Sequence, residues 1–332
     1  MQTRLRSDDV LRAELAGNVS SHRTERDHHC RCDPCTDITT LIALRLRQET
    51  ADYWRDHIVT SMEGQKRSRK VFRYGTERAH SAAMNVLITG TSSGIGRALA
   101  SRMVCSGHVV WGVARRENVN RAMRAELGDR FRFSTVDVTD GTEVRKMITE
   151  LHVSGFVPDA VVLNAGIYPH DCDEYFDDSV ADFVLKTNLS GALGLVGQML
   201  QQFLQAGAGQ FLAVSSVLAV RPDPFGVGYA SSKAALTMAF RSLALRYADT
   251  AVQFKTILLG PVATAEYSGG TPGKASLKLH LCTADQAAAA IERTLLNHCT
   301  TVYYPRLVGM AFRVTSWLPD SAFHILSRPF RR

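Results

Sequence analysis

The chain has 332 residues, of which 45% are hydrophobic and 21% are charged, and its formal net charge is +7. This length and composition predict a substantial core in one large or two modest domains. Positive charge is spread along the sequence, although three arginines lie in the last five residues, so a nucleic-acid partner is not expected. Apolar runs stay shorter than the roughly 18 to 20 residues of a membrane span, and the N-terminus has no apolar secretion signal. We expect a soluble, cytoplasmic protein.

Residues 1–83 differ from the rest, because they are highly charged and contain neither a glycine-rich phosphate turn nor strand-like alternation. We predict an N-terminal extension of unknown function that is partly disordered and has at most one docking helix, over residues 38–58. Met84 immediately precedes the first predicted strand. We therefore also hypothesise that residues 1–83 are an added or wrongly assigned N-terminus and that the functional domain is 84–332.

Seven cysteines without a secretion signal predict reduced thiols. Cys30, Cys32 and Cys35 lie together beside His28 and His29, where they could bind zinc. No second ligand pair follows at zinc-finger spacing, so we expect no metal site. A metal-binding or nucleic-acid-binding module in residues 1–83 stays open as an alternative.

The segment 84–97 combines a strand, a glycine-rich turn and the start of a helix. Residues 85–89 are rich in β-branched side chains, the turn reads TGTSSGIG, and 97–104 have helical composition. Such a unit binds a phosphate at the N-terminus of its helix. A glycine-rich hairpin is the alternative when the segment is considered alone. The residues expected to bind the cofactor here are Gly90, Ser92, Ser93, Gly94, Ile95 and Gly96.

Strands and helices then alternate along the chain. Further strands are predicted over 108–114, 131–136, 160–163, 210–214, 252–259 and 301–304. Helices are predicted over 120–127, 141–151, 179–204 and 229–248, and a last one follows a capping box at Thr283 to Gln286 and runs to 296. Continuous apolar strands separated by helices predict an α/β fold with a Rossmann-type, doubly wound parallel sheet.

Two segments near the C-terminus lack a place in this alternation. Residues 265–280 contain glycines and have no clear period, as a lid or substrate loop would. The tail 307–326 alternates apolar and polar residues. It could close a pocket, pack at a subunit interface or contact a membrane surface peripherally, but we expect ordinary core packing.

Polar residues and a glycine follow two of the predicted strands. Asp137 ends one strand, with Val138 after it, and its carboxylate can accept a hydrogen bond from an adenine amino group. Asn164, Ala165 and Gly166 end the next strand, where glycine lets the backbone run close to a ligand. Each feature alone is typical of an ordinary turn.

Tyr229 and Lys233 lie at positions i and i+4 of a predicted helix and therefore share one face. A nearby ammonium favours the ionised phenol, so we expect a Tyr229 pKa below the usual value of about 10, which suits proton exchange with a carbonyl or alcohol oxygen. Ser216, thirteen residues upstream at a strand end, can hold that oxygen. Ser215 is its adjacent rival.

Together these motifs resemble the short-chain dehydrogenase/reductase family over residues 84–305. They are TGTSSGIG, DVTD, NAG, TNLSG, VSS, YASSK and GPVAT, which begin at residues 89, 137, 164, 187, 214, 229 and 260. The resemblance implies a catalytic tetrad of Asn188, Ser216, Tyr229 and Lys233. In it, Asn188 kinks its helix and holds a water that links Lys233 to solvent.

The resemblance also implies cofactor contacts. Tyr229 and Lys233 would meet the nicotinamide ribose side of the site, and Val262 and Thr264 the nicotinamide carboxamide. Pro261 belongs to the same expected loop. Here the chain departs from the family pattern, because the usual Pro-Gly pair is replaced by Leu259 and Gly260.

The end of the second predicted strand selects between NAD and NADP. A carboxylate there holds a ribose 2′-hydroxyl, whereas arginine suits a 2′-phosphate. This chain has Arg115 and Arg116, which predict NADP(H), and Glu117, which keeps NAD(H) open as an alternative.

We therefore expect an NADP(H)-dependent oxidoreductase that interconverts an alcohol with a ketone or aldehyde, the substrate being a moderately hydrophobic small molecule. Residues 167–178, the lid and the tail would shape its pocket. A non-catalytic NADP-binding sensor or scaffold on the same fold is the alternative. By the resemblance, helices starting near Ser179 and Tyr229 would pair in a homodimer or homotetramer.

Overall fold

The computed structural model describes residues 83–169, 176–224, 226–264 and 282–327. All of them belong to the second of two compact units, Thr76–Arg332. The predicted helix over 38–58, the cysteine cluster at 30–35 and the loop 265–280 lie outside the described residues.

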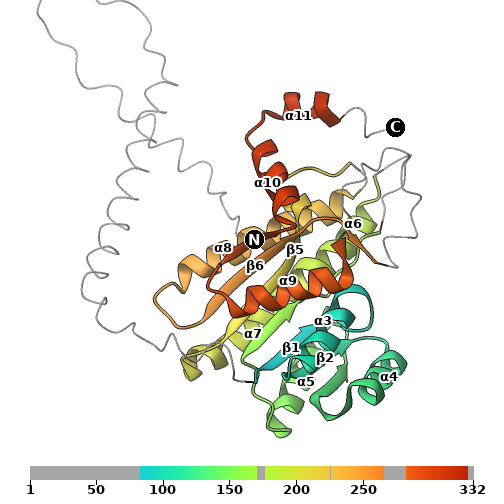
Figure 1. Ribbon diagram of the computed structural model, residues 1–332, viewed down its shortest axis with the longest axis vertical. Coiled ribbons are helices and arrows are strands. Elements are labelled where there is room, and N and C mark those ends of the chain that lie inside the picture. Colours follow the sequence, from blue (N-terminus) through green and yellow to red (C-terminus); the bar gives the residue numbers. More distant parts are fainter. Residues whose placement is uncertain (1–82, 170–175, 225, 265–281, 328–332) are drawn as a thin grey trace, which may run out of the picture. The chain divides into compact units, whose positions relative to one another are not determined.

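A seven-stranded parallel sheet forms the centre of this unit, in the order β3-β2-β1-β4-β5-β6-β9 (Figure 1). Its strands are β1 (Asn85–Thr89), β2 (Val109–Ala114), β3 (Phe131–Thr135), β4 (Ala160–Leu163), β5 (Gln210–Ser216), β6 (Gln253–Leu259) and β9 (Thr301–Tyr304). A two-residue pair, β7 (Val262–Ala263) with β8 (Cys282–Thr283), was not expected. The strand order reverses beside β1, so the predicted doubly wound fold is confirmed.

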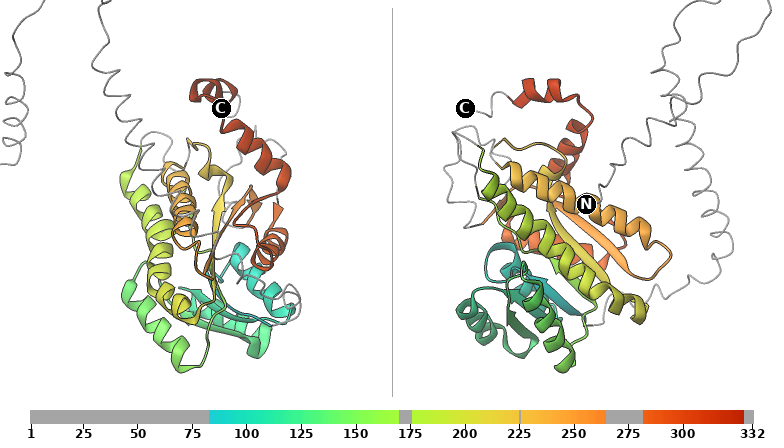
Figure 2. Two further views of the ribbon diagram at one scale, coloured as in Figure 1. Left: turned by 90° about the vertical axis from the view of Figure 1, so that its left-hand side faces the viewer. Right: turned by 180° about the vertical axis from the view of Figure 1, so that it is seen from behind.

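Helices cover both faces of the sheet (Figure 2). One face is covered by α3 (Gly94–Cys105), α4 (Glu117–Leu127) and α9 (Ala284–Leu296), and the other by α5 (Gly141–Val153), α7 (Gly191–Ala206) and α8 (Val227–Arg246). Successive strand residues point to opposite layers, since Val86 and Ile88 pack in the first core and Leu87 packs in the second. Both faces are therefore apolar, which explains the unbroken hydrophobic strands.

Side-chain hydrogen bonds cap both ends of α9. The expected capping box is present, because the Thr283 side chain accepts from the Gln286 backbone and the Gln286 side chain accepts from the Thr283 backbone. At the other end, the buried ammonium of Lys255 on β6 donates to the carbonyls of Thr294, Leu295 and Asn297. These bonds satisfy carbonyls that a helix end leaves unpaired.

The helix expected over 179–204 is interrupted. It consists of α6 (Asp178–Leu185), a π-helical segment η2 (Lys186–Ser190) and α7. The segment carries Asn188, the position where the family resemblance implies a kink. Because the turn widens only locally, the hydrophobic spacing of the sequence did not indicate it.

The tail forms α10 (Arg306–Thr315) and α11 (Asp320–Ser327). The expectation of ordinary core packing is wrong for α10, which buries only Val308 and Gly309. Leu307, Met310 and Val314 are exposed. Among the described residues, no helix is long and apolar enough to cross a membrane.

The turn between β1 and α3 depends on very close backbone contacts. Gly90 has a φ of +76°, which favours glycine, and a Cβ on Gly96 would lie 2.1 Å from the Gly90 carbonyl oxygen and 2.5 Å from Asn164 Nδ2. The Asn164 side chain in turn donates to the Thr89 carbonyl oxygen at 3.0 Å. No side-chain carbon fits at Gly96.

We predict that Gly96→Ala lowers the free energy of unfolding by about 3 kcal/mol, because the added methyl overlaps backbone that is already bonded. Urea-induced unfolding measures the change. Gly194→Ala is the matched control, since Gly194 is an exposed glycine of α7 whose added Cβ would meet nothing within 4 Å. It should raise stability by up to about 1 kcal/mol. Equal stability of the two variants would contradict this account of the turn.

Candidate functional site

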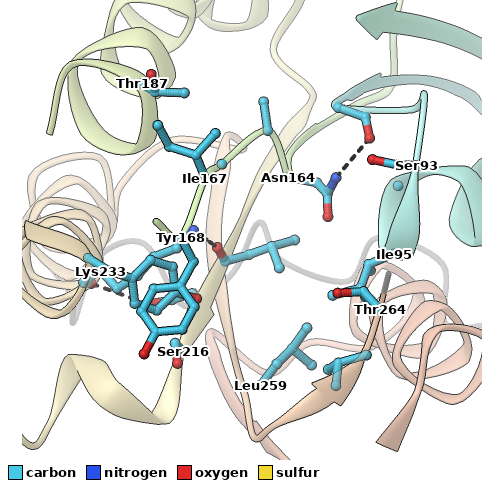
Figure 3. Close-up of a pocket in the computed structure, with 18 of the residues that line it drawn as sticks. Ser93, Ile95, Asn164, Ile167, Tyr168, Thr187, Ser216, Lys233, Leu259 and Thr264 are labelled. Carbon is cyan, nitrogen blue, oxygen red and sulfur yellow. Dashed lines mark hydrogen bonds between the residues drawn. The ribbon is translucent and has the colours of Figure 1, made fainter. Parts of the chain in front are cut away.

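A cleft of about 900 Å³ opens at the carboxyl ends of the central strands. Most of the residues predicted to bind or react line it, and Figure 3 shows two groups of them, with Ser93 and Asn164 at one end and Ser216 and Lys233 at the other. The predicted residues in the lining are Gly90, Ser92, Ser93, Ile95, Gly96, Arg115, Arg116, Asp137, Val138, Asn164, Ala165, Gly166, Ser216, Tyr229, Lys233, Pro261, Val262 and Thr264. Gly94 and Asn188 do not line it.

The loop after β4 is fastened to the end of β1. Backbone N–H groups of Asn164 and Ala165 donate to the Thr89 hydroxyl at 3.1 and 3.0 Å. Together with the Asn164 side chain, these bonds hold the β4 loop beside the glycine-rich turn. Asn164 thus supports the wall of the cleft in addition to lining it.

Arg116 turns back toward the glycine-rich turn. Its Nε and Nη2 donate to the Ser92 hydroxyl at 3.1 and 2.9 Å. No carboxylate ends β2, whose last residue is Ala114, and Glu117 accepts from Arg121 on the same helix. Two guanidinium groups, Arg115 and Arg116, and one carboxylate, Asp137, line this end of the cleft, so its net charge is positive.

Arg115 has a different environment from Arg116. Its Nη1 lies 3.7 Å from a carboxylate oxygen of Asp137. The other Asp137 oxygen accepts from the backbone and hydroxyl of Thr139, at 2.9 and 2.8 Å. Of the two arginines, Arg116 is the one hydrogen-bonded to the glycine-rich turn.

At the opposite end, Tyr229, Ser216 and Lys233 come together from α8 and β5. The Lys233 ammonium is buried, donates to the Val214 carbonyl at 2.9 Å and lies 5.7 Å from the Tyr229 ring centre. The hydroxyl of the alternative serine, Ser215, donates to the backbone carbonyl of Lys233 in α8 at 3.2 Å. Ser216 is accordingly the serine that lies next to Tyr229.

The expectation of a lowered Tyr229 pKa is wrong for this arrangement. Burial raises the pKa of Tyr229, the Ser216 hydroxyl opposes that shift by hydrogen bonding, and the negative charge of Asp223 adds to it. Burial also lowers the pKa of Lys233 to about 8. Spacing along the helix indicated that the phenol and ammonium are neighbours, but not how strongly both are desolvated.

Asn188 lies behind the cleft wall. Its side chain accepts from the Ile167 backbone N–H at 2.8 Å and donates to the Ile167 carbonyl at 2.9 Å and to the Ser232 hydroxyl at 3.2 Å. A Cβ on Gly166 would lie 3.2 Å from Asn188 Oδ1 and 3.4 Å from Lys233 Nζ. Asn188 thus ties the β4 loop to α8, directly beside Lys233.

Tyr168 and Asp223 face the reactive end of the cleft. The Tyr168 hydroxyl donates to Asp223 at 2.7 Å, and its ring lies 4.4 Å from the Tyr229 ring. Tyr168 falls in the segment predicted to shape the pocket, but sequence reasoning missed Asp223, which follows β5 in a loop without a motif. Phe183, Leu218 and Phe312 add apolar walls from α6, from the turn after β5 and from α10.

Comparisons with known proteins agree with this architecture. The chain is 30% identical to the glucose 1-dehydrogenase of Gluconobacter oxydans (strain 621H) over 190 residues, which are 55% of this chain and 71% of the relative. It is 28% identical to the 3-oxoacyl-[acyl-carrier-protein] reductase FabG of Haemophilus influenzae over 184 residues, which are 54% of this chain and 74% of that protein.

Solved structures share the fold at lower identity. A short-chain dehydrogenase from Streptomyces avermitilis superposes with a TM-score of 0.63 at 24% identity, covering 74% of this chain and 96% of its own. The closed form of serine dehydrogenase complexed with NADP⁺ gives 0.60 at 20% identity, covering 66% and 94%. The family profile described as short chain dehydrogenase matches residues 84–269. This chain therefore belongs to the short-chain dehydrogenase/reductase family of oxidoreductases.

Proposed function

We propose that the protein is an NADP(H)-dependent oxidoreductase that interconverts a ketone or aldehyde with an alcohol. One observation carries the proposal, the meeting of Tyr229, Ser216 and Lys233 at one end of a cleft whose other end is a glycine-rich turn. A phenol, a hydroxyl and an ammonium are the groups that proton transfer to a carbonyl oxygen requires.

The residues present fit a dinucleotide. Gly90 and Gly96 carry no side chains, so a pyrophosphate could approach the backbone N–H groups at the N-terminus of α3. The Arg116 guanidinium, bound to Ser92, would hold a 2′-phosphate by charge-assisted hydrogen bonds. When bound, the nicotinamide supplies or accepts the hydride.

Tyr229 is proposed to move the proton. Because burial raises its pKa, the phenol is protonated at neutral pH and could donate its proton to a carbonyl oxygen during reduction. Ser216 would hold the same oxygen as its charge grows. Lys233, fixed by the Val214 carbonyl, would support the phenolate left after donation when it is protonated.

The walls at this end favour a moderately hydrophobic, uncharged substrate. Phe183, Leu218 and Phe312 offer apolar surface to the body of the molecule. Asp223 brings a carboxylate close to Tyr229, so an anionic substrate would be repelled. Tyr168, bound to Asp223, would stack beside the reacting group.

Replacing Tyr229 with phenylalanine removes the proton donor and keeps the ring. We expect turnover to fall by about 10³-fold, with NADPH affinity changed by less than about twofold because the ring is retained. The measurement is NADPH consumption with a panel of carbonyl compounds, together with NADPH binding by fluorescence. Tyr247→Phe, near the end of the same helix and outside the cleft, is the control. NADPH binding without turnover on any carbonyl would favour the sensor or scaffold instead.

Arg116→Ala tests the cofactor. Loss of a charge-assisted contact worth about 2 kcal/mol should lower kcat/KM for NADPH by about 30-fold and leave NADH nearly unchanged. Arg121→Ala, which removes an exposed arginine paired with Glu117, should change neither value. A wild-type preference for NADH, or an equal loss with both cofactors in the Arg116 variant, would contradict the NADP(H) assignment.

Asp223→Asn removes a negative charge that raises the pKa of Tyr229. The phenol should therefore ionise at lower pH. In alcohol oxidation, where the phenolate accepts the proton, the rising limb of the pH profile should therefore shift toward lower pH. Asparagine keeps an oxygen for Tyr168, so the loop contact is retained. Asp182→Asn, an exposed carboxylate of α6, should leave the profile unchanged; an unmoved or upward limb for Asp223→Asn would argue against the electrostatic role.

A further inference from the structure

The outer face of α10 is apolar and exposed. Leu307, Met310 and Val314 are spaced as neighbours along one side of the helix, and Trp317 continues their row just beyond its end. Their exposed fractions are 82%, 63%, 61% and 82%. Large apolar side chains gathered on one surface are typical of an interaction site, whereas the same residues scattered singly would be ordinary.

The opposite face of α10 is anchored, which fixes the direction of this outer face. Gly309 packs so closely on Tyr303 that a Cβ would lie 2.3 Å from the tyrosine Cβ, and Val308 is buried beside Gly260. The buried Arg221 donates to the Thr315 hydroxyl at 3.4 Å and to the Leu318 carbonyl at 3.3 Å. These contacts oppose any rotation that would bury the outer face.

The charge beside the outer face is mainly positive. Arg306 and Arg313 are exposed on α10 and lie toward one edge of the apolar row. Asp320 is the only acidic residue in the sequence from 306 to 332. In the sequence, Arg328, Arg331 and Arg332 follow. A partner that accepts this face should therefore combine an apolar layer with negative charge.

We propose that the outer face of α10, defined by Leu307, Met310, Val314 and Trp317, docks on the surface of an anionic lipid bilayer. Apolar side chains would enter the boundary between headgroups and acyl chains, tryptophan suits that boundary, and arginines reach lipid phosphates. A second copy of the chain fits less well, since a two-fold contact through this face would bring Arg306 and Arg313 toward the arginines of the partner. The proposal concerns binding and does not depend on the reaction catalysed.

The test is cosedimentation of the full chain with vesicles of phosphatidylcholine containing phosphatidylglycerol, compared with phosphatidylcholine alone. The wild type should bind the anionic vesicles. Its tryptophan emission should move to shorter wavelength, and Trp317→Phe should remove most of that change. The triple variant Leu307→Ser, Met310→Ser, Val314→Ser should lose at least about tenfold in affinity for the vesicles. Arg306→Gln with Arg313→Gln should also weaken binding and reduce its salt dependence.

Val153→Ser with Val157→Ser is the matched control, because these valines are 85% and 54% exposed beside α5, away from the tail. This variant should bind as the wild type does. Absence of wild-type binding, or unchanged binding of the triple variant, would overturn the proposal. So would a wild-type oligomer that binds no vesicle and dissociates in the triple variant, since a second copy would then cover the face.

Discussion

The site depends on the close packing of the β1–α3 turn, the start of α3 and the loop after β4. A side-chain carbon does not fit between them at Gly96. Gly96 opens onto the Gly90 carbonyl, and the Asn164 amide closes the gap by bonding the end of β1. This contact fixes the start of α3 and the loop after β4 with respect to each other. The Ser92 hydroxyl that accepts from Arg116 belongs to the same turn.

At the end of the cleft that holds Tyr229 and Lys233, desolvation is the main cause of the pKa shifts. Lys233 is buried and Tyr229 is partly buried, and desolvation favours the neutral form of each side chain. It raises the pKa of the phenol and lowers the pKa of the ammonium to about 8. Asp223 adds a negative charge that strengthens the first effect. In the proposed reaction, the neutral phenol beside the Ser216 hydroxyl would give its proton to the carbonyl oxygen. The proposed preference for uncharged substrates rests on the same Asp223 charge.

Most of the fold could be predicted, because strands buried on both faces of a parallel sheet appear in the sequence as continuous apolar runs. The strands at 85–89, 160–163 and 301–304 were predicted at their observed bounds. Features that depend on the assembled fold could not be predicted. Asp223 approaches Tyr229 only through the path of the loop after β5, and the burial of the phenol depends on Tyr168 and the surrounding helices. The prediction that the tail packs in the core was wrong because the apolar residues of an exposed helix cannot be told from core residues in the sequence.

One face of helix α10 lines the cleft, and its opposite face is exposed to solvent. Phe312 lines the cleft from its inner side, while Met310 and Val314 point away. Arg221 joins the end of this helix to the loop that also carries Asp223. A partner on the outer face and a substrate in the cleft would therefore contact two sides of one element. The tail that the sequence predicts as core therefore has two faces. Its inner face lines the cleft through Phe312, and its outer face is the exposed apolar surface proposed to meet a membrane.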